Sequence, residues 1–310
     1  MYKIIFMGTP QFSVPGLQAL HQNGYEIVMV VTQPDRPSGR GRRIAPSAVK
    51  ETARDLAYPV IQPSSLKTPD FSDQIKSLDP DFQVVIAYGK ILPESVLALP
   101  RIGTINIHAS LLPKLRGAAP IQWAVINGEA ETGVCSMLMD KGMDTGDVLL
   151  TAKEAIEPGD TAGTLHDRLA VSGARVLIDT LKAYAENAIH PKPQDHDLAT
   201  YAPMLTKDDG LINWNKSAKA LENFIRGVTP WPGAYTFWGD KRLKIFRSTP
   251  VTAGISEPPG TVLMGFPDEL RVATGEGALS IGEIQGASGK RLTIKEFLRG
   301  HPIKPGTILG

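Results

Sequence analysis

The first 190 residues of the chain alternate short apolar runs with stretches that have helical spacing. Runs that are hydrophobic at nearly every position are typical of strands buried on both faces of a parallel sheet, and the helices between them provide the crossovers. The pattern predicts an α/β fold with a doubly wound, mostly parallel sheet. The expected strands span residues 4–7, 25–31, 59–61, 82–87, 103–107, 133–139 and 148–152, and the expected helices span 14–21, 45–56, 71–78 and 161–186.

Composition changes near residue 190, where the polar segment 190–197 contains two prolines, as linkers commonly do. One helical stretch follows, and after it come short alternating segments separated by Gly and Pro, which predict a small antiparallel barrel or sandwich. The expected limits are 1–189 for the α/β domain, 190–205 for a linker and 206–310 for the β domain. In that domain we expect a helix at 217–226 and strands at 234–238, 243–246, 260–264, 270–273 and 279–284.

The charge of the chain is nearly balanced, with 33 Lys and Arg against 32 Asp and Glu. A nucleic acid would therefore have to bind a local patch rather than the whole surface. From residue 206 onward, 14 basic residues face 10 acidic ones, which is a weak sign of a polyanionic partner. Lys241, Arg242, Lys244 and Arg247 there form either a basic stripe or an ordinary exposed edge strand.

Cys135 is the only cysteine, so no intrachain disulfide can form, and its apolar surroundings at 133–139 predict a buried structural thiol. The first residues lack the layout of a signal peptide, and no apolar run approaches the roughly 20 residues of a membrane span. We expect a cytoplasmic protein, and a monomer, since nothing in the sequence indicates an obligate dimer.

Asn106 and His108 come at the end of the apolar run 103–107. Residues two apart in a strand point to the same face, so both side chains should project together where the strand ends. Open α/β sheets bind ligands at that edge. An Asn amide can donate to an oxygen, and a His can donate or accept a proton. An Asn–His pair that only closes a strand is the common alternative for so short a motif.

The segment 139–147 is rich in turn-forming residues, with three aspartates and two glycines. A calcium loop is excluded by the spacing, because no Glu stands at the closing position. Asp140 and Asp147 fit a plain acidic turn. Asp144 lies between Gly142 and Gly146, whose flexibility would let its carboxylate reach back to His108. A carboxylate beside an imidazole orients the ring and balances its charge.

Other familiar chemistries are missing from the sequence, which has no nucleophile-elbow motif, no Cys–His arrangement and no cluster with metal-ligand spacing. The stretch after the first expected strand, Gly8–Gln11, is not a dinucleotide-binding fingerprint. What remains suits acyl-type transfer between two bound substrates, which depends on positioning and oxyanion stabilisation rather than on a covalent intermediate.

The motifs N-I-H-A-S-L-L-P at 106–113 and M-D-K-G-M-D-T-G-D at 139–147 resemble those of the folate-dependent formyltransferases. This family modifies glycinamide ribonucleotide, amino sugars and methionyl-tRNA. Three further segments, at 6–15, 32–43 and 200–214, resemble the members that act on methionyl-tRNA, so the resemblance covers nearly the whole chain.

The resemblance implies a Rossmann-like formyltransferase domain followed by an OB-like β-barrel that holds tRNA. It implies 10-formyltetrahydrofolate as donor, initiator methionyl-tRNA as acceptor and no metal. The catalytic roles carry over to Asn106, His108 and Asp144. The residues expected to line the folate site are Ser110, Leu111, Leu112 and Pro113, with the backbone around Tyr88, Ile91 and Leu92 facing the pterin.

The loop 33–43 is rich in Arg and Gly, and a charge run of this kind is usually a solvated, flexible loop. With the resemblance, however, it predicts a tRNA contact that orders on the acceptor stem, because the Arg fork suits phosphates and base edges. Arg40 is the strongest candidate. The arginines of this loop are Arg36, Arg40, Arg42 and Arg43.

Two alternatives stay open from the sequence. One is a folate-dependent formyltransferase that acts on a small amine or an amino-sugar nucleotide, which would need neither the basic loop nor the β domain. The other is a nucleic-acid-binding protein whose α/β half has no activity, which would not need Asn106, His108 and Asp144.

Overall fold

The structure is a computed structural model that describes residues 2–38, 43–252, 254–266, 268–287 and 289–310. The chain forms two compact units that interleave along the sequence. The larger comprises 1–120, 131–155 and 166–203, and the smaller comprises 121–130, 156–165 and 204–310. The domain limits expected from composition stay a prediction.

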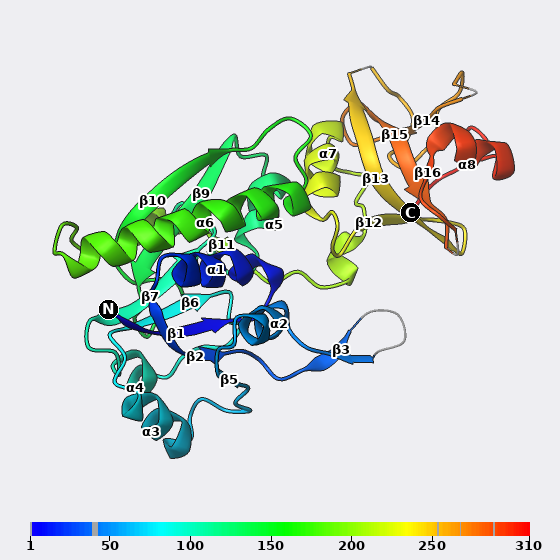
Figure 1. Cartoon of the computed structure of the whole chain (residues 1–310). Helices are drawn as coiled ribbons and strands as arrows, with labels where there is room; N and C mark the ends of the chain where they lie inside the picture. Colours follow the sequence, from blue (N-terminus) through cyan, green and yellow to red (C-terminus); the bar gives the residue numbers. More distant parts are fainter. Residues whose placement is uncertain (1, 39–42, 253, 267, 288) are drawn as a thin grey trace. The chain divides into compact units, whose positions relative to one another are not determined.

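A seven-stranded sheet with the order β10-β9-β7-β6-β1-β2-β5 forms the centre of the larger unit (Figure 1). The five strands from β7 to β5 are parallel, whereas β9 runs antiparallel to β7 and β10 antiparallel to β9. The predicted α/β class with a mostly parallel sheet is confirmed. The strands are β1 (Lys3–Gly8), β2 (Glu26–Val31), β5 (Val60–Ile61), β6 (Phe82–Ile86), β7 (Gly103–His108), β9 (Glu131–Leu138) and β10 (Val148–Ala155).

The order of the strands reverses at β1, since β2 and β5 lie on one side of it and β6 and β7 on the other. Such a switch point opens a crevice at the carboxyl ends of the two central strands, here β1 and β6. Side-chain hydrogen bonds join the segment after β1 to the end of β6 and the residues that follow it. Ser13 Oγ donates to Ile86 O at 2.6 Å, and Thr9 Oγ1 donates to Tyr88 O at 3.0 Å.

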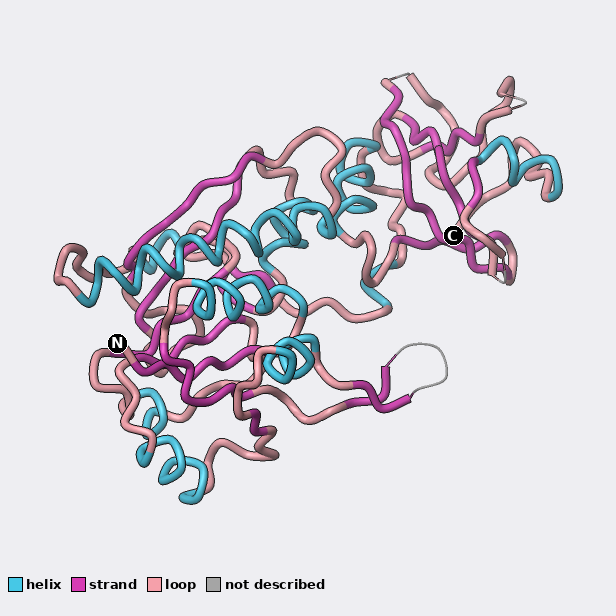
Figure 2. Tube along the Cα trace, in the orientation of Figure 1, coloured by secondary structure: helices cyan, strands magenta, loops and turns pink. Residues whose placement is uncertain are grey.

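Helices cover both faces of the sheet, so the strands lie in a layer between them (Figure 2). On one face Gly16 of α1 (Val14–Gln22) lies so close to β6 that a Cβ there would meet Ile86 Cδ1 at 2.5 Å. The helix α6 (Ala162–Ala185) packs on the same side, with Leu177 near Gly16. The remaining helices of this unit are α2 (Ala48–Asp55), α3 (Pro69–Ser77) and α4 (Glu94–Leu97).

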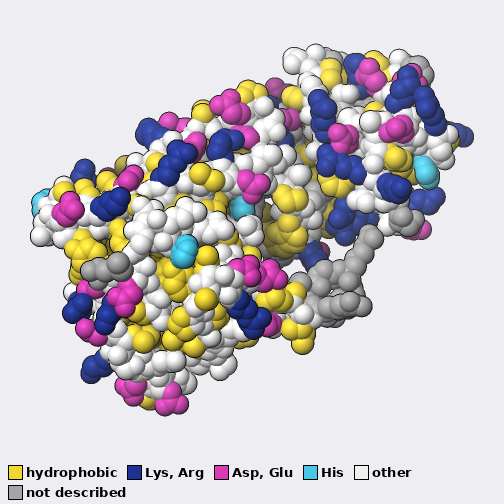
Figure 3. Space-filling model, viewed as in Figure 1, with side chains coloured by type: hydrophobic (Ala, Val, Ile, Leu, Met, Phe, Trp, Pro, Cys, Tyr) yellow, Lys and Arg dark blue, Asp and Glu magenta, His cyan; other side chains and the backbone are white. Residues whose placement is uncertain are grey.

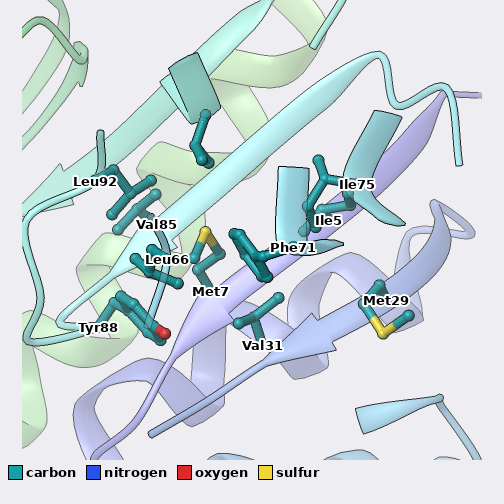
Figure 4. Packing of buried hydrophobic residues seen from close by; sticks show 11 residues of the cluster. Ile5, Met7, Met29, Val31, Leu66, Phe71, Ile75, Val85, Tyr88 and Leu92 are labelled. Atoms are coloured by element: carbon teal, nitrogen blue, oxygen red, sulfur yellow. The ribbon is translucent and has the colours of Figure 1, made fainter. Parts of the chain in front are cut away.

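The opposite face carries an apolar cluster built from β1, β2, β6 and α3 (Figure 4). Ile5 and Met7 of β1 point into it, while Ile4 and Phe6 point to the other layer, as the period of two in a strand requires. Both sides of β1 are therefore buried, which explains why its sequence is apolar at nearly every position.

Short pairings connect the loops of the larger unit, and the sequence did not predict them. A hairpin of β3 (Arg36–Ser38) and β4 (Arg43–Ala45) occupies the basic loop, and the helix expected from residue 45 starts only at Ala48, capped by the Ser47 side chain. In addition β8 (Arg116–Gly117) pairs in parallel with β11 (Tyr201–Ala202), which follows a 3-10 turn at His196–Leu198.

The smaller unit contains an antiparallel sheet in the order β12-β13-β15-β14, which confirms the expected C-terminal β domain. Since β13 pairs with β12 on one side and β15 on the other, it is not an edge strand, and that one of the two alternatives for Lys241–Arg247 is wrong. The strand expected at 260–264 is also wrong, because Thr261 and Val262 form only isolated bridges after Gly260, whose φ is +88°. The helices and strands of the smaller unit are α5 (Pro120–Ile126), α7 (Ala218–Gly227), β12 (Ala234–Trp238), β13 (Lys241–Val251), β14 (Leu270–Ala273), β15 (Ala278–Gln285), β16 (Leu292–Thr293) and α8 (Ile294–Gly300).

Over the part of the chain that the structure describes, no helix combines the length with the apolar character that a membrane crossing requires.

Candidate active site

Asn106 and His108 lie at the carboxyl end of β7, as the sequence predicted. The strand is held on both sides, with Asn106 opposite Val85 of β6 and Met137 of β9. Both side chains are largely buried, at 8% and 6% exposure. Among the described residues, the Asn106 amide has no hydrogen-bond partner, although its atoms are not sealed from solvent. An amide placed in this way is free to donate to a substrate oxygen.

The loop after β7 fixes the His108 ring. His108 Nε2 lies 3.0 Å from the carbonyl oxygen of Leu115, and a carbonyl oxygen can only accept, so Nε2 carries the proton. The loop is folded on itself, since Ser110 Oγ donates to Lys114 O at 2.6 Å. Nδ1 is therefore the ring nitrogen that remains available for chemistry.

Asp144 faces that nitrogen, with Oδ2 at 3.7 Å from His108 Nδ1. This distance suits a pair of charges but is too long for a direct hydrogen bond. The same oxygen accepts the backbone N–H of Gly117 at 2.8 Å. Gly117 has a φ of +117°, and a Cβ there would meet Ala202 O at 2.8 Å, so glycine is required at this point.

Asp144 reaches back toward His108, as the sequence predicted, although the strand before it, β9, ends near the start of β7. Because β9 is antiparallel to β7, Leu138 lies opposite Ile105, and Met139 N donates to Thr104 O near the start of β7. The segment then returns toward His108 and places Asp144 with a φ of +55°. Asp140 is structural, as predicted, because it accepts from Gly142 N and Thr145 Oγ1.

Two buried side chains that the sequence did not single out hold this returning segment. Gln194 Nε2 donates to Asp144 O at 2.9 Å and to Gly146 O at 2.7 Å. Arg116, at 2% exposure, donates to Gln194 Oε1 from two nitrogens. Only the position of Arg116 in the loop after β7 could have drawn attention to it. Gln194 lies in the segment predicted as a linker and gives no local signal.

Cys135 is fully buried, which confirms the prediction of a buried thiol, and burial raises the pKa of that thiol. In the described ranges, no group of three or more His, Cys, Asp or Glu side chains is arranged to hold a metal ion.

Known proteins resemble this chain over its whole length. The family model "Formyl transferase" matches residues 2–181, and "Formyl transferase, C-terminal domain" matches residues 204–302. The chain belongs to the formyl transferase family. Relatives named methionyl-tRNA formyltransferase include one from Desulforamulus reducens, 51% identical over 99% of this chain and 98% of its own, and one from Caldanaerobacter subterraneus, 53% identical over 99% of both.

A solved structure of an N-formyltransferase from Helicobacter canadensis, in complex with folinic acid and dTDP-3-aminofucose, shares the formyl transferase fold. It matches with a TM-score of 0.69 over 94% of this chain and 100% of its own, at 18% identity. The resemblance to folate-dependent formyltransferases drawn from the motifs is thus confirmed at the level of the family.

The residues expected at the folate site of this formyl transferase lie in two places. Ser110 is buried and its hydroxyl is already paired, while Leu111, Leu112 and Pro113 are half-buried in the same loop. Near the switch point, the Tyr88 side chain belongs to the apolar cluster, and burial raises its pKa to about 12. Leu92 is also in that cluster, whereas Ile91 is 84% exposed.

The arginine hairpin is only partly described. Arg40 and Arg42 lie outside the described residues, and Arg43 begins β4. Arg36 donates from Nη2 to Gln33 Oε1 at 2.8 Å. Gln33 in turn donates from Nε2 to Tyr88 O and Gly89 O, each at 2.9 Å, which ties the base of the hairpin to the end of β6.

Proposed function

We propose that this chain transfers the formyl group of 10-formyltetrahydrofolate to the α-amino group of methionyl initiator tRNA. The observation that carries the proposal is the convergence of Asn106, His108 and Asp144 at the end of β7, in a chain about half identical to methionyl-tRNA formyltransferases over nearly their full length. The side chains of these three residues can hydrogen-bond a carbonyl oxygen and move a proton.

The reaction needs one bond to form and one to break. The neutral α-amine of the methionyl ester attacks the formyl carbon, and the carbonyl oxygen becomes an oxyanion. The bond from that carbon to the folate nitrogen then breaks, and the proton lost by the amine reaches the leaving nitrogen. No covalent intermediate with the protein is formed, so positioning and charge stabilisation supply the rate.

Each side chain has a role set by its contacts. The Asn106 amide donates to the oxyanion. His108 acts through Nδ1, since Nε2 is held by Leu115 O, and protonated Nδ1 donates to the same oxygen. Asp144 balances the imidazolium charge across 3.7 Å and passes the proton of the amine toward the folate nitrogen through a water.

The folate would lie at the switch point between β1 and β6. Ala87 and Gly89 have φ values of +44° and +81°, so the backbone turns sharply just after β6, at the edge where open α/β sheets bind ligands. The segment 110–113 would form a second wall, contributing backbone and the half-buried Leu111, Leu112 and Pro113 rather than the paired Ser110 hydroxyl.

The tRNA would be held by basic surfaces on each unit. In the larger unit these are the arginines Arg36, Arg40, Arg42 and Arg43 of the hairpin. In the smaller unit, Figure 3 shows Lys and Arg gathered on the visible face. On β13, Arg242 stacks on the Tyr235 ring at 3.6 Å, and Lys241 and Arg247 are exposed. Contacts between such basic side chains and phosphates would position a nucleic acid without reading its sequence.

A half-buried polar network supports the base of the arginine hairpin. Lys50 Nζ contacts Asp35 Oδ2 and Gln62 Oε1, each at 2.5 Å, and Gln62 Nε2 donates to Gln33 O and Asp35 Oδ1, each at 2.7 Å. The hydrogen bond from Lys50, followed by that from Gln62, lowers the pKa of Asp35 from 3.8. This contribution to hairpin order is present above that pH and is lost as the pH falls through the lower, folded-state pKa.

We expect Lys50→Met to raise the KM for tRNA about 10-fold while changing the KM for folate less, because the hairpin base loses its anchor. Steady-state kinetics with each substrate varied in turn measures both constants. The matched control is Lys153→Met, which removes a surface pair with Glu131 at 2.8 Å, where both side chains are more than half exposed. Equal effects on the tRNA KM in the two variants would contradict the role of the hairpin.

The rival that the fold permits is formyl transfer to an amino-sugar nucleotide. The test is to incubate the protein with 10-formyltetrahydrofolate and, in separate reactions, methionyl initiator tRNA, free methionine and dTDP-3-aminofucose. We expect formylation of the tRNA-linked methionine alone. Faster formylation of the sugar would replace the proposal with its rival. The proposal also includes a cytoplasmic location, with which the single free cysteine is consistent, and a monomeric state.

A further inference from the structure

The segment that carries Asp144 is held at its backbone as well as at its carboxylate. Gln194 is 8% exposed and uses both amide hydrogens, donating to Asp144 O at 2.9 Å and to Gly146 O at 2.7 Å. Asp144 has a left-handed φ of +55°, a backbone conformation that costs more free energy for aspartate than for glycine. Contacts from outside the segment must therefore hold this conformation.

Arg116 fixes the direction in which Gln194 acts. A guanidinium can only donate, so the amide oxygen must face Arg116 and the amide nitrogen must face the two carbonyls. Arg116 Nη2 also contacts His196 Nδ1 at 3.0 Å. Within the described ranges no carboxylate lies at ion-pair distance from this buried guanidinium, so it is committed to neutral acceptors.

Residues 116 and 117 therefore hold Asp144 at two points. Gly117 N–H binds the carboxylate directly, and Arg116 reaches the Asp144 carbonyl through Gln194. The loop that contains them also supplies Leu115 O, which orients the His108 ring. One loop thus sets both members of the His108–Asp144 pair.

We infer that Gln194, oriented by Arg116, is a positioning residue that sets the separation between His108 Nδ1 and the Asp144 carboxylate. This inference rests on the proposed role of these two residues in formyl transfer. The rate depends steeply on the positions of the catalytic groups, and a displacement near 1 Å can cost on the order of 10²-fold in rate. The 24-residue helix α6 and the segment after it would then place Gln194 beside this loop.

The test compares Gln194→Leu and Gln194→Glu with the wild type. Both variants lose the two donors, and we expect kcat to fall about 10- to 100-fold, with the KM of each substrate within about 3-fold of the wild-type value. The Glu variant keeps an acceptor for Arg116 and adds an opposite charge. A residue that served only to satisfy Arg116 would be replaced well by Glu, whereas a positioning residue would not.

A double-variant comparison isolates the route of action. In an Asp144→Asn background, Gln194→Leu is expected to cause little further loss of kcat, because the group it positions is already removed. The control is Gln83→Leu. Gln83 is fully buried in β6 and its amide has no hydrogen-bond partner among the described residues, so kcat should be unchanged. Thermal unfolding of each variant shows whether it folds.

Wild-type kcat in Gln194→Glu, or a full additional loss from Gln194→Leu in the Asp144→Asn background, would overturn the inference. These outcomes differ from failure of the proposed site. If Asp144→Asn alone kept the wild-type rate, the role of Asp144 itself would be wrong, and the inference would fall with it. A slow Asp144→Asn beside a fast Gln194→Leu would overturn only the positioning role.

Discussion

Replacing His108 with Ala is expected to lower kcat by about 10³-fold, within the range for a group that moves a proton and stabilises charge in the transition state. The ring is held by Leu115 O at Nε2 and faces Asp144 with Nδ1, so its removal deletes the donor and also leaves the carboxylate without its partner. The rate of a single turnover, with both substrates saturating, measures this loss directly. The KM values should change little, because the interaction is made in the transition state.

His166 provides the matched control for this variant. It also lies beside a carboxylate, with Nδ1 at 2.9 Å from Asp167 Oδ1, but it belongs to α6 and its partner is exposed. His166→Ala is expected to keep the wild-type rate. A His108→Ala enzyme that kept more than about a tenth of the wild-type kcat would show that the ring has no direct part in the reaction.

The second large effect is expected from Asn106→Ala, which should lower kcat by about 10²- to 10³-fold through loss of one oxyanion donor. In the described residues, the amide of Asn106 binds no other group, so its removal should leave the stability of the fold nearly unchanged. Thermal unfolding together with single-turnover kinetics separates the two effects.

Thr104→Val is the control for Asn106→Ala, because it deletes a polar group from the same face of the same strand. Thr104 is buried and its hydroxyl donates to Leu97 O at 2.9 Å, so the variant should lose about 1 kcal/mol of stability without loss of kcat. If Asn106→Ala instead lost stability and retained its rate, the residue would be a structural strand closure, the alternative that the short motif left open.

The regular elements of the larger unit could be predicted because burial dictates their composition. A strand such as β1, buried on both faces, must be apolar at successive positions, and helices such as α1, between the parallel strands β1 and β2, must fill the crossovers. Strand direction could not be predicted in the same way, since an apolar run looks the same in either direction. The antiparallel course of β9 therefore appears only in the structure, and it changes how Asp144 reaches His108.

The site could be predicted in part for a related reason. Asn106 and His108 are two apart on one strand, so local geometry alone brings them together. The contacts of Gln194 with Asp144 and Arg116 join positions 50 and 78 residues apart, and no periodicity in the sequence encodes them. The β3–β4 hairpin was missed because its strands are only three residues long, too short to show the alternation that marks a strand.

The measurement that tests the central claim most directly is the ratio of kcat/KM for methionyl initiator tRNA to kcat/KM for dTDP-3-aminofucose, with 10-formyltetrahydrofolate as donor for both. Discrimination through buried polar contacts and an extended surface reaches roughly 10⁴-fold or more. We predict a ratio of at least that size, with the tRNA reaction slowed about 10³-fold by His108→Ala. A ratio near or below one, or a His108→Ala enzyme that keeps more than about a tenth of the wild-type rate with the tRNA, would contradict the account.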